Sequence, residues 1–200
     1  MAPEAKRSGV APEAMPTIRP LTSADVSRLG QIDANFESDR FLDLEKSIDG
    51  LNVTWRLIER PLDPPFVSTD YSIQPGELAE IAGRIHAGGI HLIVEDNARP
   101  VALVDVETQD WRSAANVWHI LIDRAYRRQG FGTQLMQRVI DWARSARLRG
   151  IVCETQTNNL PACRFYQRLG FQMCGIDDHF YTNEDVAVKE VAVFWWYEVK

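Results

Sequence analysis

The sequence is poor in several features that define common protein classes. Its 200 residues include only 3 cysteines, which lack the paired spacing of a metal site, so reduced thiols are expected rather than a disulfide framework. The histidines show no metal-ligand spacing either. No apolar run approaches the roughly 18 residues of a membrane span. Because no apolar segment follows a basic start, we expect a cytoplasmic protein without a secretion signal.

An excess of basic residues is also missing. The formal net charge is −6, whereas a nucleic-acid-binding protein would carry a basic balance, so that class is not expected. A negative protein suits a cationic small-molecule substrate better. The content of 45% hydrophobic and 25% charged residues is that of an ordinary globular domain, and the length suffices for one sizeable core.

The pattern along the chain predicts a disordered tail and one domain. Residues 1–16 are rich in Ala, Pro and Glu, a composition typical of disorder, and residues 17–200 form the domain. Expected helices begin near Ser23, Pro75, Gly132 and Leu160, and expected strands are 17–19, 41–48, 53–60, 91–95, 101–107, 116–122, 151–155, 171–181 and 190–199. Asp49-Gly50 marks a hairpin. These segments predict an α/β fold with a mixed, mostly antiparallel sheet of about seven strands and helices on both faces.

The most informative segment is the glycine-bearing turn at residues 127–133, Arg-Arg-Gln-Gly-Phe-Gly-Thr. An apolar strand precedes it, and a helix with apolar residues at helical spacing follows it. Unpaired amides at a helix start, with glycines that let the backbone approach a ligand, are typical of a phosphate site. A P-loop would need a lysine after Gly132, and a dinucleotide fingerprint would need a small residue in place of Leu135. Neither of these motifs fits.

Together with the segments after it, this turn resembles the R/Q-x-x-G-x-G/A loop of the GNAT N-acetyltransferases. Residues 159–171, Asn-Leu-Pro-Ala-Cys-Arg-Phe-Tyr-Gln-Arg-Leu-Gly-Phe, are similar to that family's N-x-x-A-x-x-x-Y-x-x-x-G-F segment. Glu-Thr-Gln-x-Asn-Asn at 154–159 and Gly-x-Asp-x-x-x-Tyr at 175–181 look most like the streptothricin acetyltransferase subgroup. A GNAT fold is therefore expected.

The resemblance implies acetyl-coenzyme A as the acyl donor. The amides of the turn would hold its pyrophosphate, arginines would add charge, and the strand before the turn would pair with pantetheine. The implied cofactor-binding residues are Ile120, Leu121, Ile122, Arg127, Arg128, Gln129, Gly130, Phe131, Gly132, Thr133, Asn159, Ala162 and Tyr166. Asn159 also suits the N-cap of the helix that follows it.

Tyr166 is the catalytic residue that the resemblance implies, as the donor of a proton to the coenzyme A sulfur. A phenol suits this role because it keeps its proton at neutral pH. A second interpretation stays open, because Tyr166 lies on the apolar face of its predicted helix and a buried core tyrosine has the same pattern.

The general base is where the sequence departs from the proteins it resembles. The subgroup usually carries Ile-Glu-Asp where this chain has Val117-Trp118-His119, so both expected carboxylates are absent. His119 is a candidate base because its reference pKa is about 6.5, and an inert histidine in a sheet is the competing interpretation. Glu107, Glu154 and water-mediated proton loss are the other candidates.

The acceptor site is the least determined part of the sequence. Candidate substrate-binding residues are Trp118, Glu154, Asp177 and Tyr181, of which the last two match the subgroup segment. Core packing is an equal alternative for Trp118. The predicted hairpin should overhang the cleft, and its acids Asp39, Asp43 and Asp49 are either substrate contacts or a solvated face.

These features predict an enzyme that transfers the acetyl group of acetyl-coenzyme A to a primary amine of a small cationic acceptor, by direct attack in a ternary complex. A streptothricin-like antibiotic is the acceptor that the resemblance implies, and antibiotic resistance would be the role. Two other functions stay open: acetylation of a peptide or protein amine, and non-catalytic binding of an acyl-coenzyme A as a sensor. The aromatic run at 193–197 fits either a buried strand or a homodimer interface.

Overall fold

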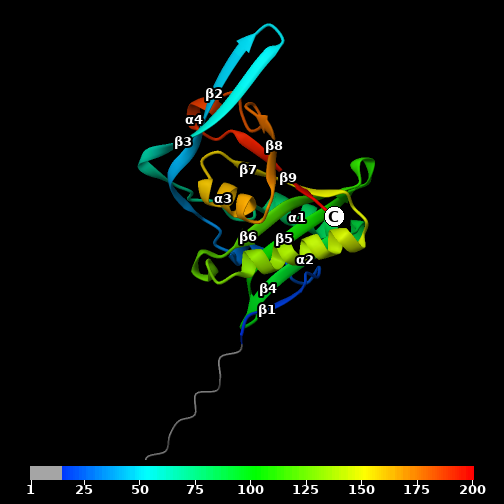
Figure 1. The fold of residues 1–200 in the computed structure, drawn as a ribbon. Helices are drawn as coiled ribbons and strands as arrows, with labels where there is room; N and C mark the ends of the chain where they lie inside the picture. The colour runs from blue at the N-terminus through cyan, green and yellow to red at the C-terminus, as the bar shows by residue number, and fades with distance from the viewer. Residues whose placement is uncertain (1–14) are drawn as a thin grey trace, which may run out of the picture.

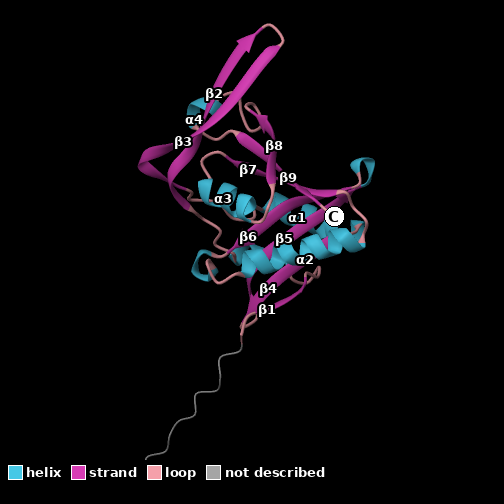
Figure 2. Ribbon diagram, viewed as in Figure 1, coloured by secondary structure: helices cyan, strands magenta, loops and turns pink. Residues whose placement is uncertain are grey.

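A computed structural model describes residues 15–200 of the protein, so residues 1–14 of the predicted tail lie outside the described part. A central sheet carries helices against its faces, and a long hairpin projects from one end of the body (Figure 1). Helices and strands alternate along most of the chain, as the sequence pattern predicts (Figure 2).

The central sheet has seven strands in the order β1-β4-β5-β6-β7-β9-β8. The neighbours β6 and β7 run parallel, and the other neighbouring pairs run antiparallel. The predicted mixed, mostly antiparallel sheet is thus confirmed. Its strands are β1 (Thr17–Pro20), β4 (Gly89–Asp96), β5 (Arg99–Gln109), β6 (Ala114–Ile122), β7 (Gly150–Gln156), β8 (Gln172–Asp177) and β9 (Ala192–Glu198).

The bounds of the helices follow from the residues at their ends. The longer helices are α1 (Pro75–Ala87), α2 (Phe131–Ser145) and α3 (Leu160–Arg168), and the short ones are η1 (Val26–Gln31), η2 (Asp110–Arg112), η3 (Arg124–Tyr126) and α4 (Asp185–Val188). At the start of α1, the backbone N–H of Gln74 donates to Glu77 Oε2 at 2.7 Å as half of a capping box. The helix ends at Gly88, whose φ of 98° favours glycine.

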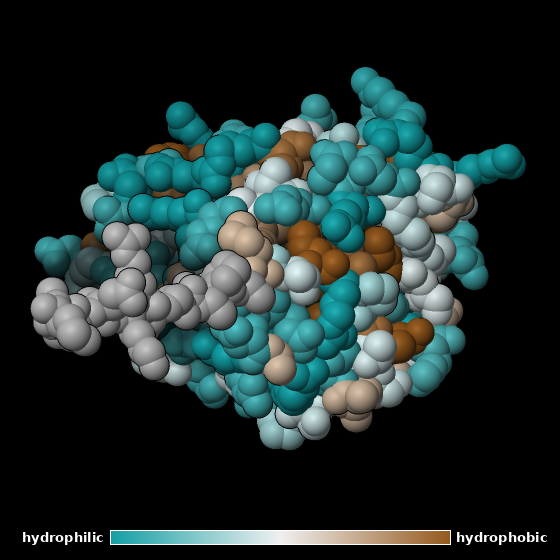
Figure 3. Space-filling model, turned by 90° about the horizontal axis from the view of Figure 1, so that it is seen from below, coloured by the Kyte–Doolittle hydropathy of each residue, from teal (hydrophilic) through white to brown (hydrophobic). Residues whose placement is uncertain are grey.

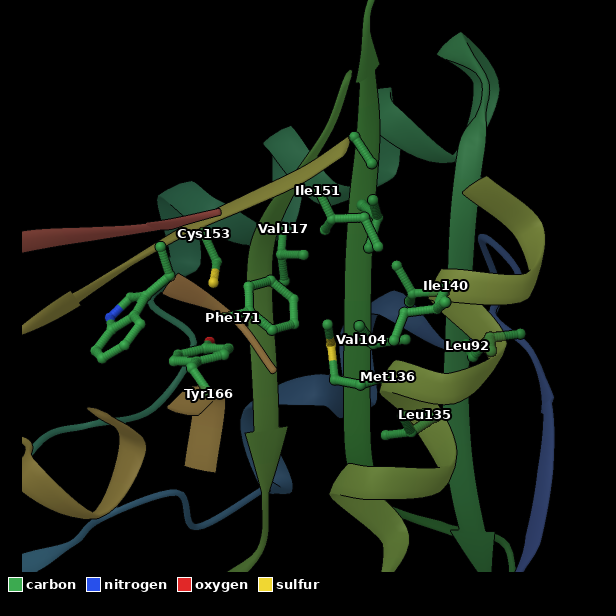
Figure 4. Close-up of a cluster of buried hydrophobic side chains, with 14 of the residues drawn as sticks. Leu92, Val104, Val117, Leu135, Met136, Ile140, Ile151, Cys153, Tyr166 and Phe171 are labelled. Carbon is green, nitrogen blue, oxygen red and sulfur yellow. The ribbon is translucent and has the colours of Figure 1, made fainter. Parts of the chain in front are cut away.

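Strand alternation sends apolar side chains to both faces of the sheet. On one face, Leu92 of β4 and Val104 of β5 join α2 and α3 in a buried cluster, part of which is drawn in Figure 4. On the other face, Ile93 and Leu103 join Ile81 of α1 in a second cluster. Full burial of such a side chain contributes about 2 kcal/mol. The predicted helices on both faces follow from this two-sided apolar pattern.

The predicted hairpin is longer than expected and forms a sheet of its own. Its strands are β2 (Glu37–Asp49) and β3 (Asn52–Val67), and the turn includes Gly50 at φ 59°. The prolines at 61, 64 and 65 lie inside β3, where their fixed φ and missing N–H are tolerated on an edge strand. A salt bridge from Lys46 Nζ to Asp178 Oδ2, at 2.6 Å, ties the hairpin to the segment after β8.

Two local predictions are wrong. The helix expected from Ser23 is the 3-10 helix η1, which starts later because Asp25 accepts hydrogen bonds from the backbone and hydroxyl of Thr22 and holds a turn there. Ser23 instead bonds His86 at 3.2 Å. The strand expected to reach residue 181 stops at Asp177, whose carboxylate accepts the His179 amide at 3.0 Å and turns the chain.

One face of the molecule, seen in Figure 3, is mainly hydrophilic with apolar side chains in small separate areas. Within residues 15–200, no helix combines the length and apolarity needed to cross a bilayer. The same residues contain no group of three or more His, Cys, Asp or Glu side chains arranged to hold a metal ion.

Gly150 at the start of β7 gives a direct test of the packing. A Cβ at this position would overlap the ring of Trp196, so Gly150→Ala should destabilise the protein by about 1–3 kcal/mol through overpacking. Gly83 in α1 is the matched control, since its Cβ would meet no atom within 4 Å, and Gly83→Ala should stabilise by about 0.5–1 kcal/mol. Urea unfolding of both variants measures the difference, and equal effects would contradict the packing.

Candidate functional site

The main cavity lies where β6 and β7 diverge. Its volume is about 1080 Å³, which suits an extended organic ligand. One side is formed by β6, the loop and start of α2, the end of β7, and α3. The other side is formed by the start of β2, the segment after β3, and α1.

A bulge in β6 opens this cavity. Strands β6 and β7 pair only as far as Val117 and Cys153. At the same level the register between β5 and β6 shifts, so that Trp118 is an extra residue without a partner in β5. A bulge of this kind bends and twists the strand. Beyond Trp118, the edge of β6 that faces β7 therefore presents backbone N–H and C=O groups to the cavity.

The start of α2 lies at the end of that open edge. Its first backbone bond runs from Gln134 N to Gly130 O at 3.0 Å, so the three amides before Gln134 are outside the helical ladder. Gly130 has φ 87°, and a Cβ on Gly132 would lie 3.3 Å from the Phe165 ring. Glycine thus allows both the turn and the close approach of α3. Free amides at a positive helix end fit a diphosphate group.

Most residues that the sequence singled out come together here. Those that line the cavity are Trp118, His119, Ile120, Leu121, Ile122, Arg127, Arg128, Gly130, Phe131, Gly132, Thr133, Glu154, Asn159, Ala162 and Tyr166. Gln129 does not line it, and its amide donates to Ala125 O at 3.2 Å. Asn159 caps α3 as predicted, because its Oδ1 accepts the Ala162 amide at 3.3 Å.

Arg127 is bound inward, which departs from the expected charge contact. Its Nε donates to Ile122 O at 3.2 Å and its Nη2 to Ala34 O at 2.5 Å, and burial lowers the pKa of its guanidinium. The side chain therefore braces the end of β6 against the segment before β2. Arg128, exposed at the cavity with φ 62°, is the arginine of the turn that faces solvent.

Tyr166 combines the two interpretations that the sequence left open. It is only 4% exposed, and its ring packs 5.5 Å from Phe171 and 6.0 Å from Trp195. Figure 4 shows its side chain beside that of Cys153. Burial raises the pKa of Tyr166 well above its usual value. It is thus a core residue that keeps its proton beside the cavity.

His119 lies between two carboxylates. Its Nδ1 is 3.2 Å from Asp105 Oδ2 and its Nε2 is 3.1 Å from Glu77 Oε1. Burial opposes the charged ring, but the hydrogen bonds to Asp105 and Glu77 outweigh burial and raise the pKa of His119. With both ring nitrogens engaged as donors, His119 is poorly suited to accept a proton at neutral pH.

Asp105 is the centre of this network. Its carboxylate is fully buried and is bound by Arg84 Nε at 2.9 Å, His91 Nδ1 at 2.7 Å and His119. Burial alone would raise the pKa of Asp105, but these three hydrogen bonds lower it below its usual range. Trp118 is held beside the network, with its ring under Arg84 at 5.0 Å and its Nε1 donating to Glu107 at 2.8 Å.

The pKa of Glu154 is shifted in the opposite direction to that of Asp105. Burial raises the pKa of Glu154 to about 7, and although the hydrogen bond from Tyr181 opposes this shift, the negative charge of Glu190 adds to it. The Tyr181 hydroxyl donates to the Glu154 carboxylate. Tyr181 therefore contacts a cavity residue without lining the cavity itself. A carboxyl group that titrates near neutral pH can take up or release a proton there.

The remaining predicted acids do not gather at the cavity as a group. Asp39 lines it. Asp43 lies away from it and is paired with Arg60 at 2.6 Å, and Asp49 is at the end of β2 beside the exposed hairpin turn. Asp177 lies outside the cavity and accepts the His179 amide.

Sequence reasoning missed several residues of the site. Glu77 and Tyr71 line the cavity, and Asp105 hydrogen bonds with the ring of His119. Asp105 carried a signal, because it is the one charged residue in the apolar run at 101–106, and a charge inside a buried strand needs partners. Tyr71 carried none, since it belongs to an irregular segment whose position depends on the tertiary structure.

Breaking the network at Asp105 should be costly. Asp105→Asn leaves Arg84 and His119 without their buried counter-charge, and we expect a loss of about 3–5 kcal/mol in the free energy of unfolding. Asp141→Asn is the matched control, because it breaks an exposed pair with Arg144 at 3.0 Å and should cost less than about 1 kcal/mol. Urea unfolding measures both. Similar losses in the two variants would mean that Asp105 contributes no more than a surface charge.

Several known proteins are similar to this chain. A streptothricin acetyltransferase of Escherichia coli is 34% identical over 110 residues, which cover 52% of this chain and 63% of that protein. Streptothricin acetyltransferase A of Bacillus subtilis (strain 168) is 35% identical over 89 residues, which cover 44% of this chain and 51% of that protein. The match thus spans between half and two thirds of the length of these relatives.

Solved structures share the fold. The crystal structure of nourseothricin acetyltransferase superposes with a TM-score of 0.74 at 22% identity, covering 92% of this chain and 99% of that one. A protein from Bacillus anthracis str. Ames, solved in complex with acetyl coenzyme A, superposes with a TM-score of 0.67 at 24% identity, covering 93% of this chain and 98% of that one.

These similarities confirm the resemblance drawn from the turn at 127–133 and the segment at 159–171. The model of the Acetyltransferase (GNAT) family matches residues 54–171, which is more than half of the chain and includes β6, the turn, α2, β7 and α3. The chain therefore belongs to the GNAT acetyltransferase family.

Proposed function

We propose that this protein transfers the acetyl group of acetyl-coenzyme A to a primary amine of a small cationic acceptor. One observation carries the proposal: a single cavity joins an open strand edge and a helix start, which suit the donor, to a carboxyl group with a pKa of about 7. The relatives named streptothricin acetyltransferases support a streptothricin-like antibiotic as the acceptor.

The donor would be held mostly by backbone groups. The amides at the start of α2 would bind its pyrophosphate, and the open edge of β6 from His119 to Ile122 would pair with its pantetheine amides as an added strand does. Arg128 supplies positive charge at the turn, while Arg127 fixes the shape of the strand end. The bound donor supplies the acyl group as a thioester.

Glu154 is the proposed general base. A primary amine has a reference pKa near 10.4 and is mostly protonated at neutral pH, so its proton must be removed before it can attack a carbonyl. Glu154 lines the cavity, and burial holds the pKa of its carboxyl group at about 7, close to the working pH. His119 is less suited, because its ring nitrogens already contact the carboxylates of Asp105 and Glu77, and these contacts raise its pKa and favour the charged ring.

Tyr166 is the proposed proton donor to the leaving sulfur. Its raised pKa keeps the phenol protonated, so that it can stabilise a developing thiolate by a hydrogen bond. With Glu154 as base and Tyr166 as donor, the amine can attack directly. Cys153 and Cys163 are unsuited to an acyl-enzyme, because burial raises the pKa of both thiols.

The charge of the cavity supports a cationic acceptor. Its acidic residues come from β2, the segment after β3, α1 and β7, and they are Glu37, Asp39, Asp70, Glu77 and Glu154. Its arginines come from the turn and from α3, and they are Arg127, Arg128, Arg164 and Arg168. Four of the acids thus lie on the wall of β2, the segment after β3 and α1, whereas Glu154 of β7 shares its wall with the arginines. The arginines suit a phosphate-bearing donor, and the acids suit an amine.

The function is tested by release of free coenzyme A from acetyl-coenzyme A with a panel of cationic amines, streptothricin included. Turnover with at least one small amine supports the proposal. Acetylation confined to peptides or proteins would favour the second enzyme function, which the similarity to a ribosomal-protein-alanine N-acetyltransferase, at 30% identity over 78 residues, keeps in view. Tight donor binding without turnover would favour a sensor.

Glu154 sets the expected pH dependence. Because the base must be ionised, kcat/KM should rise with pH through about 7, the pKa of Glu154. Glu154→Gln should remove this step and lower kcat/KM by about 100-fold. His119→Gln is the control, and the midpoint should stay in place. A midpoint lost in His119→Gln but kept in Glu154→Gln would assign the base to His119 instead.

Tyr166→Phe separates the chemical role of the hydroxyl from the packing of the ring. The phenylalanine keeps the contacts with Phe171 and Trp195, so the fold should persist, but kcat should fall by about 100-fold. Calorimetry should show little change in the Kd for acetyl-coenzyme A. Tyr197→Phe, which removes a hydroxyl from a ring that packs 5.2 Å from Phe171 and does not line the cavity, should change kcat less than about twofold. Unchanged turnover in Tyr166→Phe would leave Tyr166 as a core residue only.

A further inference from the structure

A second, smaller cavity adjoins the main one. Its volume is about 270 Å³, and its wall contains Phe36, Asp70, Tyr71 and Gln156, which also line the main cavity. The remaining lining residues are Phe66, Val67, Ser68, Thr69 and Glu190. Because the two cavities share these residues, one ligand can contact both.

Aromatic rings form one side of the smaller cavity. The Phe36 ring is 5.5 Å from the Phe66 ring, and it meets the Tyr71 ring edge-on at 5.2 Å. Ring faces carry negative electrostatic potential and attract ammonium groups, most strongly where water is excluded. This side of the cavity is suited to a cation with an alkyl stem.

Glu190 supplies negative charge on another side. It is half-buried before β9, and within residues 15–200 its carboxylate has no ion-pair partner. Burial raises the pKa of Glu190, and the charge of nearby Asp185 raises it further. A carboxylate that has lost water without gaining a counter-charge would be stabilised by a bound cation.

Gln156 adds a hydrogen-bond acceptor that has no donor partner among the described residues. Its side chain lines both cavities. Its Oε1 is buried and has no hydrogen-bond partner among the described residues, a state that costs free energy unless a donor reaches it. An ammonium group has three N–H donors and can meet both Gln156 Oε1 and Glu190.

The spacing along β7 relates this second site to the proposed base. Glu154 and Gln156 are two residues apart on one strand, so their side chains point to the same face and lie about 7 Å apart. Glu190 is close enough to Glu154 to raise its pKa. A ligand with one amine at Glu154 would therefore extend towards Gln156 and Glu190.

We propose that the smaller cavity binds a second ammonium group of the acceptor, so that the protein prefers elongated acceptors with two amines about 7 Å apart or more. This inference rests on the proposed function, because it assumes that the first amine reacts at Glu154. The selectivity comes from the ring faces of Phe36 and Tyr71 and from the acceptors Gln156 Oε1 and Glu190.

Kinetics with matched amines test the subsite. The probes are linear diamines from diaminopropane to diaminooctane, each compared with the monoamine of the same chain length. In the native protein, the ratio of kcat/KM for diamine to monoamine should rise by at least about tenfold once the chain is long enough, as expected for one charge-assisted contact. In Glu190→Gln this ratio should fall by about tenfold, mainly through KM.

Glu184→Gln is the matched control. It removes one negative charge from the exposed side of the same segment, outside both cavities, and should keep the preference for diamines. A ratio near one in the native protein, or an equal loss in Glu184→Gln and Glu190→Gln, would overturn the subsite while leaving amine acetylation intact.

A separate measurement distinguishes failure of the proposed function from failure of the subsite. If no amine releases coenzyme A, that function is overturned, and calorimetry then decides on the subsite alone. Binding of a long diamine that weakens about tenfold in Glu190→Gln but not in Glu184→Gln would support the second cation site. Equal binding of the diamine to both variants and to the native protein would overturn it.

Discussion

The separation of β6 from β7 is the constraint on which the site depends. Two parallel strands that pair as far as Val117 and Cys153 would normally continue their hydrogen bonds, and here the bulge at Trp118 turns β6 away. The divergence leaves a strand edge with unused backbone groups, opens the cavity, and brings the start of α2 to the end of that edge. The position of the proposed base follows from it, since Glu154 is the residue of β7 directly after the last pair.

Two acid–base settings stand on opposite sides of this opening. Asp105 is buried with three hydrogen-bond partners, so its charge is stabilised, and it raises the pKa of His119, which also contacts Glu77. Glu154 is buried with one hydroxyl donor and a second acid near it, so its charge is not stabilised. The subgroup's Glu-Asp pair is absent at positions 118 and 119, and in our proposal Glu154 on the neighbouring strand takes the role of the base.

The same strand relates the reaction to the choice of acceptor. Alternation along β7 sends Glu154 and Gln156 to one face, and the segment after β3 brings Asp70 and Tyr71 over them. The hairpin before that segment is long and tied to the body by Lys46 and Asp178. The proposed reaction therefore depends on Glu154, which belongs to a regular strand, whereas the proposed recognition of a second amine depends partly on Tyr71 in an irregular segment. Local sequence specifies the strand more strongly than the irregular segment.

Local sequence determined much of this protein. Alternating apolar residues specify the strands on both faces, Gly88 and Asn159 specify helix ends, and the glycines at 127–133 specify the turn before α2, because each depends on short-range backbone geometry. The turn at Asp25 and the strand end at Asp177 were mispredicted, since side-chain acceptors there compete with the regular element. Only the tertiary structure decided which groups share an environment: that Asp105 reaches His119, that Glu154 loses its water, and that Tyr71 and Glu190 meet at one cavity. Burial and charge partners come from residues far apart in the chain, and pKa values depend on both.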